Sequence, residues 1–255
     1  LRIRPDAVFS YTIKPNLYSL IAAFLVRIPH KFILITGLGF FFRSQQNRIV
    51  KRFLTKIYGY FLKKSDCIFF QNHDDKDTFK KLNLISRDQE IQIVAGSGVN
   101  LDHYRFKEIT DTNTLSFLFI GRLLKDKGIL EFLQAAIEIG KHDNQTRFKV
   151  LGWTEPSKNS ISEYDLKRLN SQYNIEVINR VKDVRPIIES SHVLVHPSYH
   201  EGMPRSVLEA MSIGRPIITT DAPGCRESII HKHNGYIVKR ANVELLIDAI
   251  NKFIN

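Results

Sequence analysis

Three absences narrow the classes of protein to which this sequence can belong. The chain has two cysteines, Cys67 and Cys225, in neither a paired nor a metal-ligand context, which is typical of a reducing cytoplasm. No apolar run reaches the roughly 18–20 residues that cross a bilayer, since Arg27 ends one run at 17–26 and glycines interrupt another at 32–42. The start of the chain resembles no signal peptide and lacks an initiator Met, so we expect a fragment.

Further absences argue against particular enzymes. The sequence has no GK[ST] phosphate loop, which argues against ATP hydrolysis. It has no G-x-G-x-x-G stretch, which a nucleotide-sugar epimerase would need to bind its dinucleotide. His73 stands beside Asp74 and Asp75, but this spacing is wrong for a metal site and more typical of a helix cap.

Positive charge is in surplus. There are 37 Lys and Arg against 26 Asp and Glu, which favours an anionic partner such as nucleic acid, anionic lipid or a phosphorylated substrate. The cations are spread over several elements, which argues against a nucleic-acid groove. Residues 43–64 form a basic helical pattern with apolar residues at helical spacing. That pattern fits either contact with an anionic membrane surface or an ordinary packed helix with a solvated basic face.

Strands and helices alternate along the whole chain, which predicts a parallel, doubly wound α/β sheet in each half. The polar, aperiodic residues 102–114 predict a linker, so we expect one domain at 1–105 and a second at 106–255. In the second half, the expected strands lie at 115–120, 148–151, 176–178, 193–195 and 217–219, and the expected helices at 129–139, 164–173, 184–190, 204–213 and 243–253.

Most of the functional information lies at 193–229. A buried strand leads into a polar loop, and Pro204 suits the first turn of the helix that follows. This places a helix N-terminus, with its partial positive charge, at the carboxyl end of a strand, where open α/β sheets bind anions. Glu201 and Glu209 flank this N-terminus. Because carboxylates accept hydrogen bonds from hydroxyls, we expect a ligand that carries both phosphate and sugar.

The turn at 121–128 supplies cations at the end of another strand. Arg122 offers a planar fork that grips phosphate, and Lys127 offers a movable point charge. Two cations there suit a diphosphate leaving group, although two solvated cations at a turn are the simpler alternative.

The spacing Glu201-Gly-Met-Pro-Arg-Ser-Val-Leu-Glu209, together with Gly214-Arg215-Pro216 and the turn at 121–128, resembles the retaining GT-B glycosyltransferases of the E-x7-E family. The resemblance implies two Rossmann-like parallel-sheet domains that face a cleft, with the N-terminal domain truncated. It implies catalytic roles for Arg122, Lys127 and Glu201, with no metal or other cofactor. It also implies a donor-binding set: Gly121, Arg122, Lys127, Glu201, Gly202, Met203, Pro204, Ser206, Val207 and Glu209.

Further roles follow from the same resemblance. Arg122 and Lys127 would stabilise charge on the departing diphosphate, and Glu209 would bind the ribose. The nucleotide base would lie near Arg180, Val181 and Val184, where many family members have a glycine in place of Arg180. Thr36, Gly37 and Gly39 would lie on the acceptor side, and Thr36 stands where many relatives have a histidine.

The first half resembles a narrower branch of that family. The segments at 9–16, 35–39, 70–72 and 96–99 are similar to bacterial transferases that extend polyprenyl-diphosphate-linked glycans for capsule or O-antigen. We therefore expect transfer of a hexose or N-acetylhexosamine from a UDP-sugar to a lipid-linked glycan in the cytoplasm, with peripheral contact with an anionic membrane and no nucleic-acid partner. The alternative is a truncated, inactive remnant that binds a nucleotide-sugar.

Overall fold

The computed structural model describes residues 5–38, 48–109, 114–157, 159–162, 166, 173 and 175–255. The chain divides into two compact units. The first unit comprises Leu1–Ser97 with Glu201–Met203, and the second comprises Gly98–His200 with Pro204–Asn255. Each unit has its own hydrophobic core.

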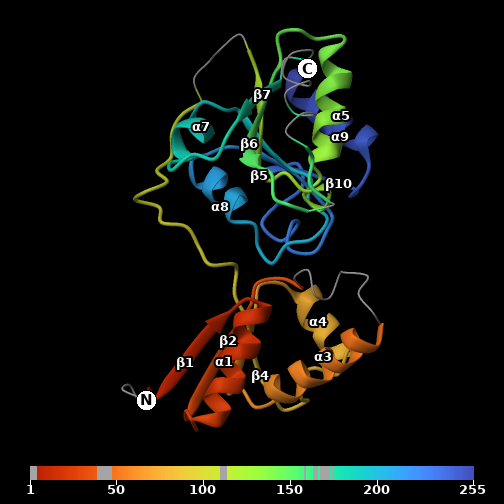
Figure 1. Ribbon diagram of the computed structural model, residues 1–255. Helices are drawn as coiled ribbons and strands as arrows, with labels where there is room; N and C mark the ends of the chain where they lie inside the picture. The colour runs from red at the N-terminus through yellow and green to blue at the C-terminus, as the bar shows by residue number, and fades with distance from the viewer. Residues whose placement is uncertain are drawn as a thin grey trace. The chain divides into compact units, whose positions relative to one another are not determined.

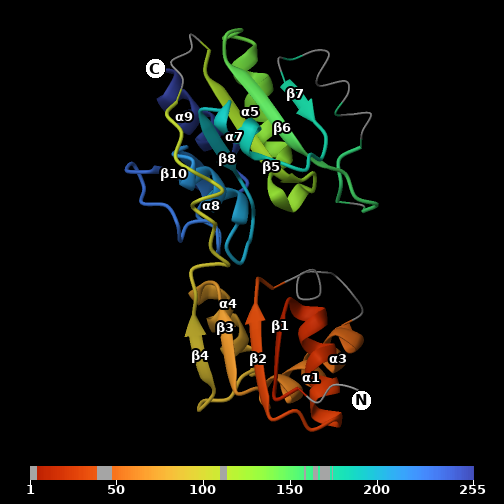
Figure 2. The same ribbon diagram turned by 90° about the vertical axis from the view of Figure 1, so that its left-hand side faces the viewer.

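The first unit is a four-stranded parallel sheet with the strand order β1-β2-β3-β4 (Figures 1 and 2). Its elements are β1 (Ala7–Tyr11), α1 (Ile13–Leu25), β2 (His30–Ile35), α3 (Arg48–Leu62), β3 (Cys67–Phe70), α4 (His73–Lys81) and β4 (Glu90–Ile93). Because the strands add in sequence order through right-handed crossovers, the helices between them fall on one face of the sheet. The buried side chains of Leu20, Tyr58 and Phe79 accordingly share one core with Ile33 and Phe70 of the strands.

The second unit is a six-stranded parallel sheet with the order β10-β9-β8-β5-β6-β7. Its strands are β5 (Ser116–Arg122), β6 (Arg147–Trp153), β7 (Ile175–Ile178), β8 (Val193–His196), β9 (Ile217–Thr220) and β10 (Gly235–Val238). Its helices are η1 (Lys125–Lys127), α5 (Ile129–Gly140), α7 (Arg185–Glu189), α8 (Arg205–Ser212) and α9 (Val243–Ile254). The predicted parallel α/β alternation is thus confirmed in both halves.

Helices cover both faces of the second sheet. In Figure 1, α5 and α9 lie on one side of the strands, and α7 and α8 lie on the other. Successive side chains of β5 point to opposite faces of the sheet. Phe117 packs in the core under α5 and α9, and Leu118 packs in the core under α7 and α8. The direction of strand addition reverses between β5 and β8, which is where doubly wound sheets bind their ligands.

The segment expected to be a linker runs along the second unit. Tyr104 is buried in the core beneath α8, and the Lys107 amide donates to the carbonyl of Ile213. The compact units accordingly divide between Ser97 and Gly98, whereas the sequence placed the boundary between residues 105 and 106. The helix expected at 164–173 lies almost entirely outside the described residues.

Candidate functional site

The two motifs predicted to act together are held together by hydrogen bonds at the switch point between β5 and β8. The carbonyl oxygen of Asp126, in the turn after β5, accepts from the Tyr199 amide at 3.0 Å and from the Ser198 hydroxyl at 3.3 Å. These partners lie in the loop after β8, and the chain between them is more than 70 residues long. Because β5 and β8 are neighbours in a parallel sheet, their carboxyl ends meet at one edge and the turns that follow them come into contact.

Gly128 makes this contact close. Its backbone has a φ of 72°, and a Cβ built at this position would lie 2.0 Å from the carbonyl oxygen of Pro197. A side chain of any kind is therefore excluded unless the backbone moves. On the other side of the loop, the hydroxyl of Thr219 in β9 donates to the carbonyl of His196 at 2.9 Å. The loop after β8 is thus fixed from both sides.

Arg122 and Lys127 lie at the ends of two short elements of this turn. Arg122 is the last residue of β5 and follows Gly121, and its Nη1 lies 3.3 Å from Oε2 of Glu155. The Arg122 side chain keeps 44% of its surface exposed, so a ligand can reach it. Lys127 ends η1 and is half-buried. Both cations therefore stand at the carboxyl edge of the sheet, as the sequence predicted.

Glu209 is buried and already held by two partners. Its Oε1 lies 2.9 Å from Nε of Arg205, one turn earlier in α8, and its side chain also forms a hydrogen bond with Tyr104. Burial and the hydrogen bond to this carboxylate raise the pKa of Tyr104 above its ordinary value. The carboxylate is therefore oriented in advance, which suits a group that is to accept hydrogen bonds from hydroxyls.

The N-terminus of α8 lies after the loop. Pro204 occupies the N-cap and no side chain caps the helix there. Ser206 is half-buried and Val207 is fully buried, where it packs in the core with Tyr104. Val207 thus anchors the first turn through its buried side chain, and its predicted part in donor binding stays a prediction.

The residues predicted to bind the nucleotide base lie after β7. Val181 and Val184 are half-buried and pack against the same core as α8. The guanidinium of Arg180 lies 5.1 Å from the ring centroid of Trp153, the last residue of β6. This ring, 39% exposed, gives the segment a flat apolar surface that the sequence did not predict.

Other predicted residues fall in the first unit. Thr36 and Gly37 follow β2, and the backbone of Gly37 has a φ of 114°. Gly39 lies outside the described residues. Glu201, Gly202 and Met203 group with the first unit by their contacts. The predicted convergence of Glu201 with Arg122, Lys127 and Glu209 therefore stays a prediction.

Comparison with known proteins decides the family. The sequence pattern of the family described as "Glycosyl transferases group 1" matches residues 101–255, which include the whole β5 and β8 region. The chain belongs to this family.

Two curated relatives cover nearly all of this glycosyl transferases group 1 chain. One is N,N'-diacetylbacillosaminyl-diphospho-undecaprenol alpha-1,3-N-acetylgalactosaminyltransferase of Campylobacter jejuni, 26% identical over 96% of this chain and 67% of that protein. Another is UDP-Gal:alpha-D-GlcNAc-diphosphoundecaprenol alpha-1,3-galactosyltransferase of Escherichia coli, 25% identical over 96% of this chain and 65% of that protein. The chain thus spans about two thirds of the length of these relatives.

Solved structures of the same fold include Anabaena Alr3699/HepE in complex with UDP, with a TM-score of 0.80 over 98% of this chain and 69% of that one at 16% identity. Sucrose-phosphate synthase from Thermosynechococcus elongatus gives a TM-score of 0.78 over 98% of this chain and 64% of that one, also at 16% identity. At this identity the likeness shows the fold, and the predicted GT-B class is confirmed.

Three contacts of this family member were not predicted from its sequence: Tyr104 with Glu209, Glu155 with Arg122, and Trp153 with Arg180. Tyr104 was assigned to a linker because its surroundings are polar, and Glu155 lies in a polar stretch after the strand that ends at Trp153. A signal for Trp153 was nevertheless present, because it is the one tryptophan of the chain and stands two residues after the strand expected at 148–151.

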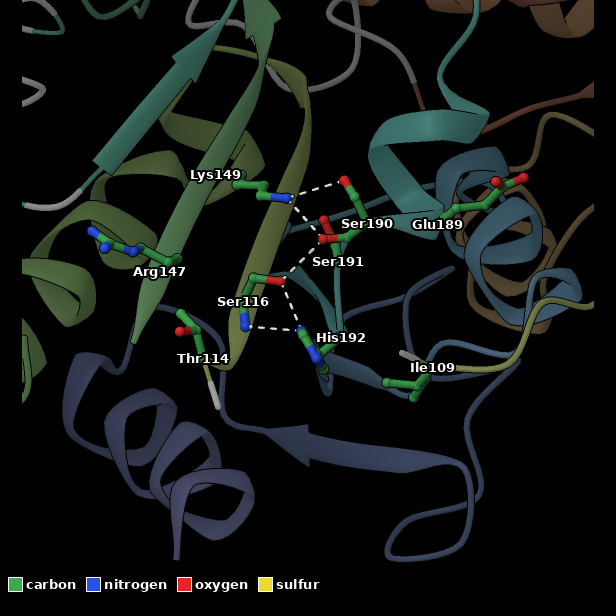
Figure 3. A pocket seen from close by; sticks show the side chains of 9 residues that line it. All are labelled: Ile109, Thr114, Ser116, Arg147, Lys149, Glu189, Ser190, Ser191 and His192. Atoms are coloured by element: carbon green, nitrogen blue, oxygen red, sulfur yellow. Dashed lines mark hydrogen bonds between the residues drawn. The ribbon is translucent and has the colours of Figure 1, made fainter. Parts of the chain in front are cut away.

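A pocket of about 420 Å³ lies elsewhere in the second unit (Figure 3). Ser116, Arg147 and His192 stand in it at the amino ends of their strands, opposite the edge that carries Arg122. Its polar groups pair with one another, since the Ser116 hydroxyl lies 2.8 Å from Nδ1 of His192 and Lys149 Nζ donates to the carbonyl of Ser190 at 2.8 Å. Of the predicted site residues that the structure describes, none lines this pocket.

Within the described ranges, no group of three or more His, Cys, Asp or Glu side chains is placed to hold a metal ion.

Proposed function

We propose that this protein is a retaining glycosyltransferase that moves a hexose or N-acetylhexosamine from a UDP-sugar to a polyprenyl-diphosphate-linked glycan in surface polysaccharide biosynthesis. The observation that carries the proposal is the junction of two turns at the β5–β8 switch point, which sets two cations beside a loop that leads into a helix N-terminus. The names of the Campylobacter and Escherichia relatives, which specify undecaprenol-linked acceptors, support the acceptor class.

Arg122 and Lys127 would bind the diphosphate of the donor. A diphosphate carries the negative charge that grows as the bond to the sugar breaks, and an Arg fork with a Lys point charge stabilises that growth. The N-terminus of α8 would add partial positive charge at the same edge. Because Arg122, Lys127 and the helix N-terminus would supply positive charge at the diphosphate, the proposed reaction needs no metal ion.

The sugar and nucleoside would be held by groups around this diphosphate. Glu209, buried and oriented by Arg205, would accept hydrogen bonds from the ribose hydroxyls. Glu201, with the backbone at 202–204, would contact the transferred sugar. The base would lie beside Arg180, where the ring of Trp153 offers a surface for stacking.

In the proposed transfer, the bond between the anomeric carbon and the diphosphate oxygen breaks, and its electron pair leaves with UDP. The acceptor hydroxyl oxygen forms the new bond to the same carbon and on the same face, and its proton passes to the departing diphosphate. Configuration at the anomeric carbon is retained. The acceptor would approach from the side of Thr36, Gly37 and Gly39, and the reaction would take place in the cytoplasm beside the membrane that holds the lipid.

The test is to incubate the full-length gene product with a set of UDP-sugars and an undecaprenyl-diphosphate-linked acceptor, and to measure UDP release and the glycan formed. The proposal expects one sugar to give a product with retained anomeric configuration. UDP-sugar binding without any transfer would identify a binding remnant, and a product of inverted configuration would refute the retaining mechanism.

A further inference from the structure

Nearly all of the net positive charge of the chain comes from one stretch of the first unit. Residues 7–65 contain ten Lys and Arg and no Asp or Glu, whereas the whole chain has a formal net charge of +11. The remaining three quarters of the chain is therefore close to neutral. Such a concentration of one sign creates a local field that attracts anions and anionic surfaces.

Helix α3 contains four of these ten cations and α1 contains one, Lys14, and the two helices pack side by side on one face of the first sheet (Figure 2). The rings of Phe24 in α1 and Phe61 in α3 meet edge to face at 5.7 Å. Each helix buries one side against the sheet, with Leu20 and Ala23 in α1 and Tyr58 in α3. Residues two positions away point about 200° around a helix and thus away from the sheet.

The side chains that point away are apolar as well as basic. On α1, Tyr18 is 66% exposed and Leu25 is 73% exposed. On α3, Phe53 is 63% exposed and Tyr60 is 55% exposed. The α1–α3 face is defined by the exposed residues Tyr18, Leu25, Arg52, Phe53, Lys56 and Tyr60 of the two helices, with Lys64 in the turn after α3.

Aromatic rings and ammonium groups lie close together at one end of this face. Nζ of Lys64 lies 4.9 Å from the ring centroid of Tyr60 and 5.4 Å from that of Phe24. A soluble surface that is only solvated needs cations but not exposed large apolar side chains beside them. The combination is typical of a surface that rests on lipid headgroups, since rings enter the interface while Lys and Arg reach the phosphates.

We propose that the α1–α3 face docks on an anionic bilayer surface. This deepens the proposed function, because it names the surface that would bring the protein to a lipid-linked acceptor. Two signals act together, as stable peripheral binding requires: apolar side chains that enter the interface and cations that pair with anionic headgroups. Among the described residues, none of the helices is long and apolar enough to cross a bilayer.

The test measures binding of the full chain to vesicles of phosphatidylcholine with and without phosphatidylglycerol, by co-flotation at low and physiological salt. The charge variant is Arg52→Gln with Lys56→Gln, and its matched control is Lys80→Gln with Lys81→Gln on α4 of the same unit. We expect the charge variant to weaken binding to the anionic vesicles by roughly tenfold or more, and the control to weaken it by much less.

The apolar variant is Tyr18→Ser with Leu25→Ser. Its matched control is Leu101→Ser with Ile230→Ser, which are 68% and 65% exposed in the second unit. We expect a loss of roughly tenfold in the variant alone, because only its side chains enter the interface.

Three results would overturn the proposal: no binding of the wild type to anionic vesicles, equal losses in variants and controls, or RNA binding that the charge variant loses while the apolar variant keeps it. UDP binding measured on the same proteins separates this proposal from the proposed function. A wild type that floats with anionic vesicles but binds no UDP refutes the transferase, and one that binds UDP but never floats refutes the docking face.

Discussion

Gly128 offers a sharp test of how the two turns of the candidate site are joined. At this residue the turn after β5 meets the loop after β8, and the space for a side chain is filled by the carbonyl of Pro197. We predict that Gly128→Ala separates the two turns. Gly98 is the matched control, because its φ of 71° is nearly that of Gly128 at 72° while a Cβ there would meet nothing within 4 Å.

The expected size of the effect has two parts. Placing alanine in the left-handed region costs about 1 kcal/mol, and this part is common to both positions. At Gly128 the added Cβ would also lie 2.0 Å from a backbone oxygen, which no rotamer change can relieve. Forced overpacking of this kind costs about 1–3 kcal/mol. The prediction is therefore a loss of about 2–4 kcal/mol for Gly128→Ala and about 1 kcal/mol for Gly98→Ala.

Urea unfolding followed by tryptophan fluorescence measures this difference directly. Trp153 is the one tryptophan of the chain and ends β6, so its emission reports on the second unit. At a comparable slope, the midpoint for Gly128→Ala should fall well below that for Gly98→Ala. Equal midpoints would show that the turn and the loop are not packed as described, and the reasoning about their junction would fail.

The remaining predictions concern single side chains of the second unit. Arg122→Ala should lower the rate of transfer by about 100-fold or more, because it removes a cation that stabilises the departing diphosphate. The urea midpoint should change little, because the ion pair between Arg122 and Glu155 is half exposed. A wild-type rate of transfer in this variant would refute the role of Arg122. Tyr104→Phe removes a hydrogen bond to Glu209 and should cost about 1 kcal/mol in the same urea assay, and no loss would contradict that contact. Burial and a hydrogen bond to Glu131 raise the pKa of Tyr199 from 10.0 to about 12. The contribution of Tyr199 to the free energy of unfolding should therefore be lost as the pH rises from 10.0 to about 12, and Tyr199→Phe should remove this loss. A pH profile of stability that is the same in Tyr199→Phe as in the wild type would contradict this prediction.

The sequence predicted the α/β alternation well because buried parallel strands are short apolar runs. It also placed Arg122 and Lys127 in the turn at the end of β5, and the α8 N-terminus after the polar loop that follows β8. The pairing of β5 with β8 could not be derived in the same way. Strand order depends on which crossovers pack together, and no local pattern encodes it.

Other features were hidden by their local surroundings. β6 runs to Trp153, but Gly152 makes the strand seem to end at Leu151. Tyr104 lies in a polar stretch, so only the tertiary structure shows that its ring is buried beneath α8. The short β10, Gly235–Val238, was not predicted, because four residues beside a turn carry too little periodicity.

The central claim is that Arg122 and Lys127 bind the diphosphate of a UDP-sugar, and titration of UDP into the full chain tests it most directly. Arg122→Ala and Lys127→Ala should each weaken UDP binding by roughly tenfold or more, because each removes a charge-assisted hydrogen bond. The matched control is Lys125→Ala, an exposed cation in the same turn, and its affinity should stay close to that of the wild type. Equal affinities for all four proteins, or no binding of UDP by the wild type, would contradict the claim.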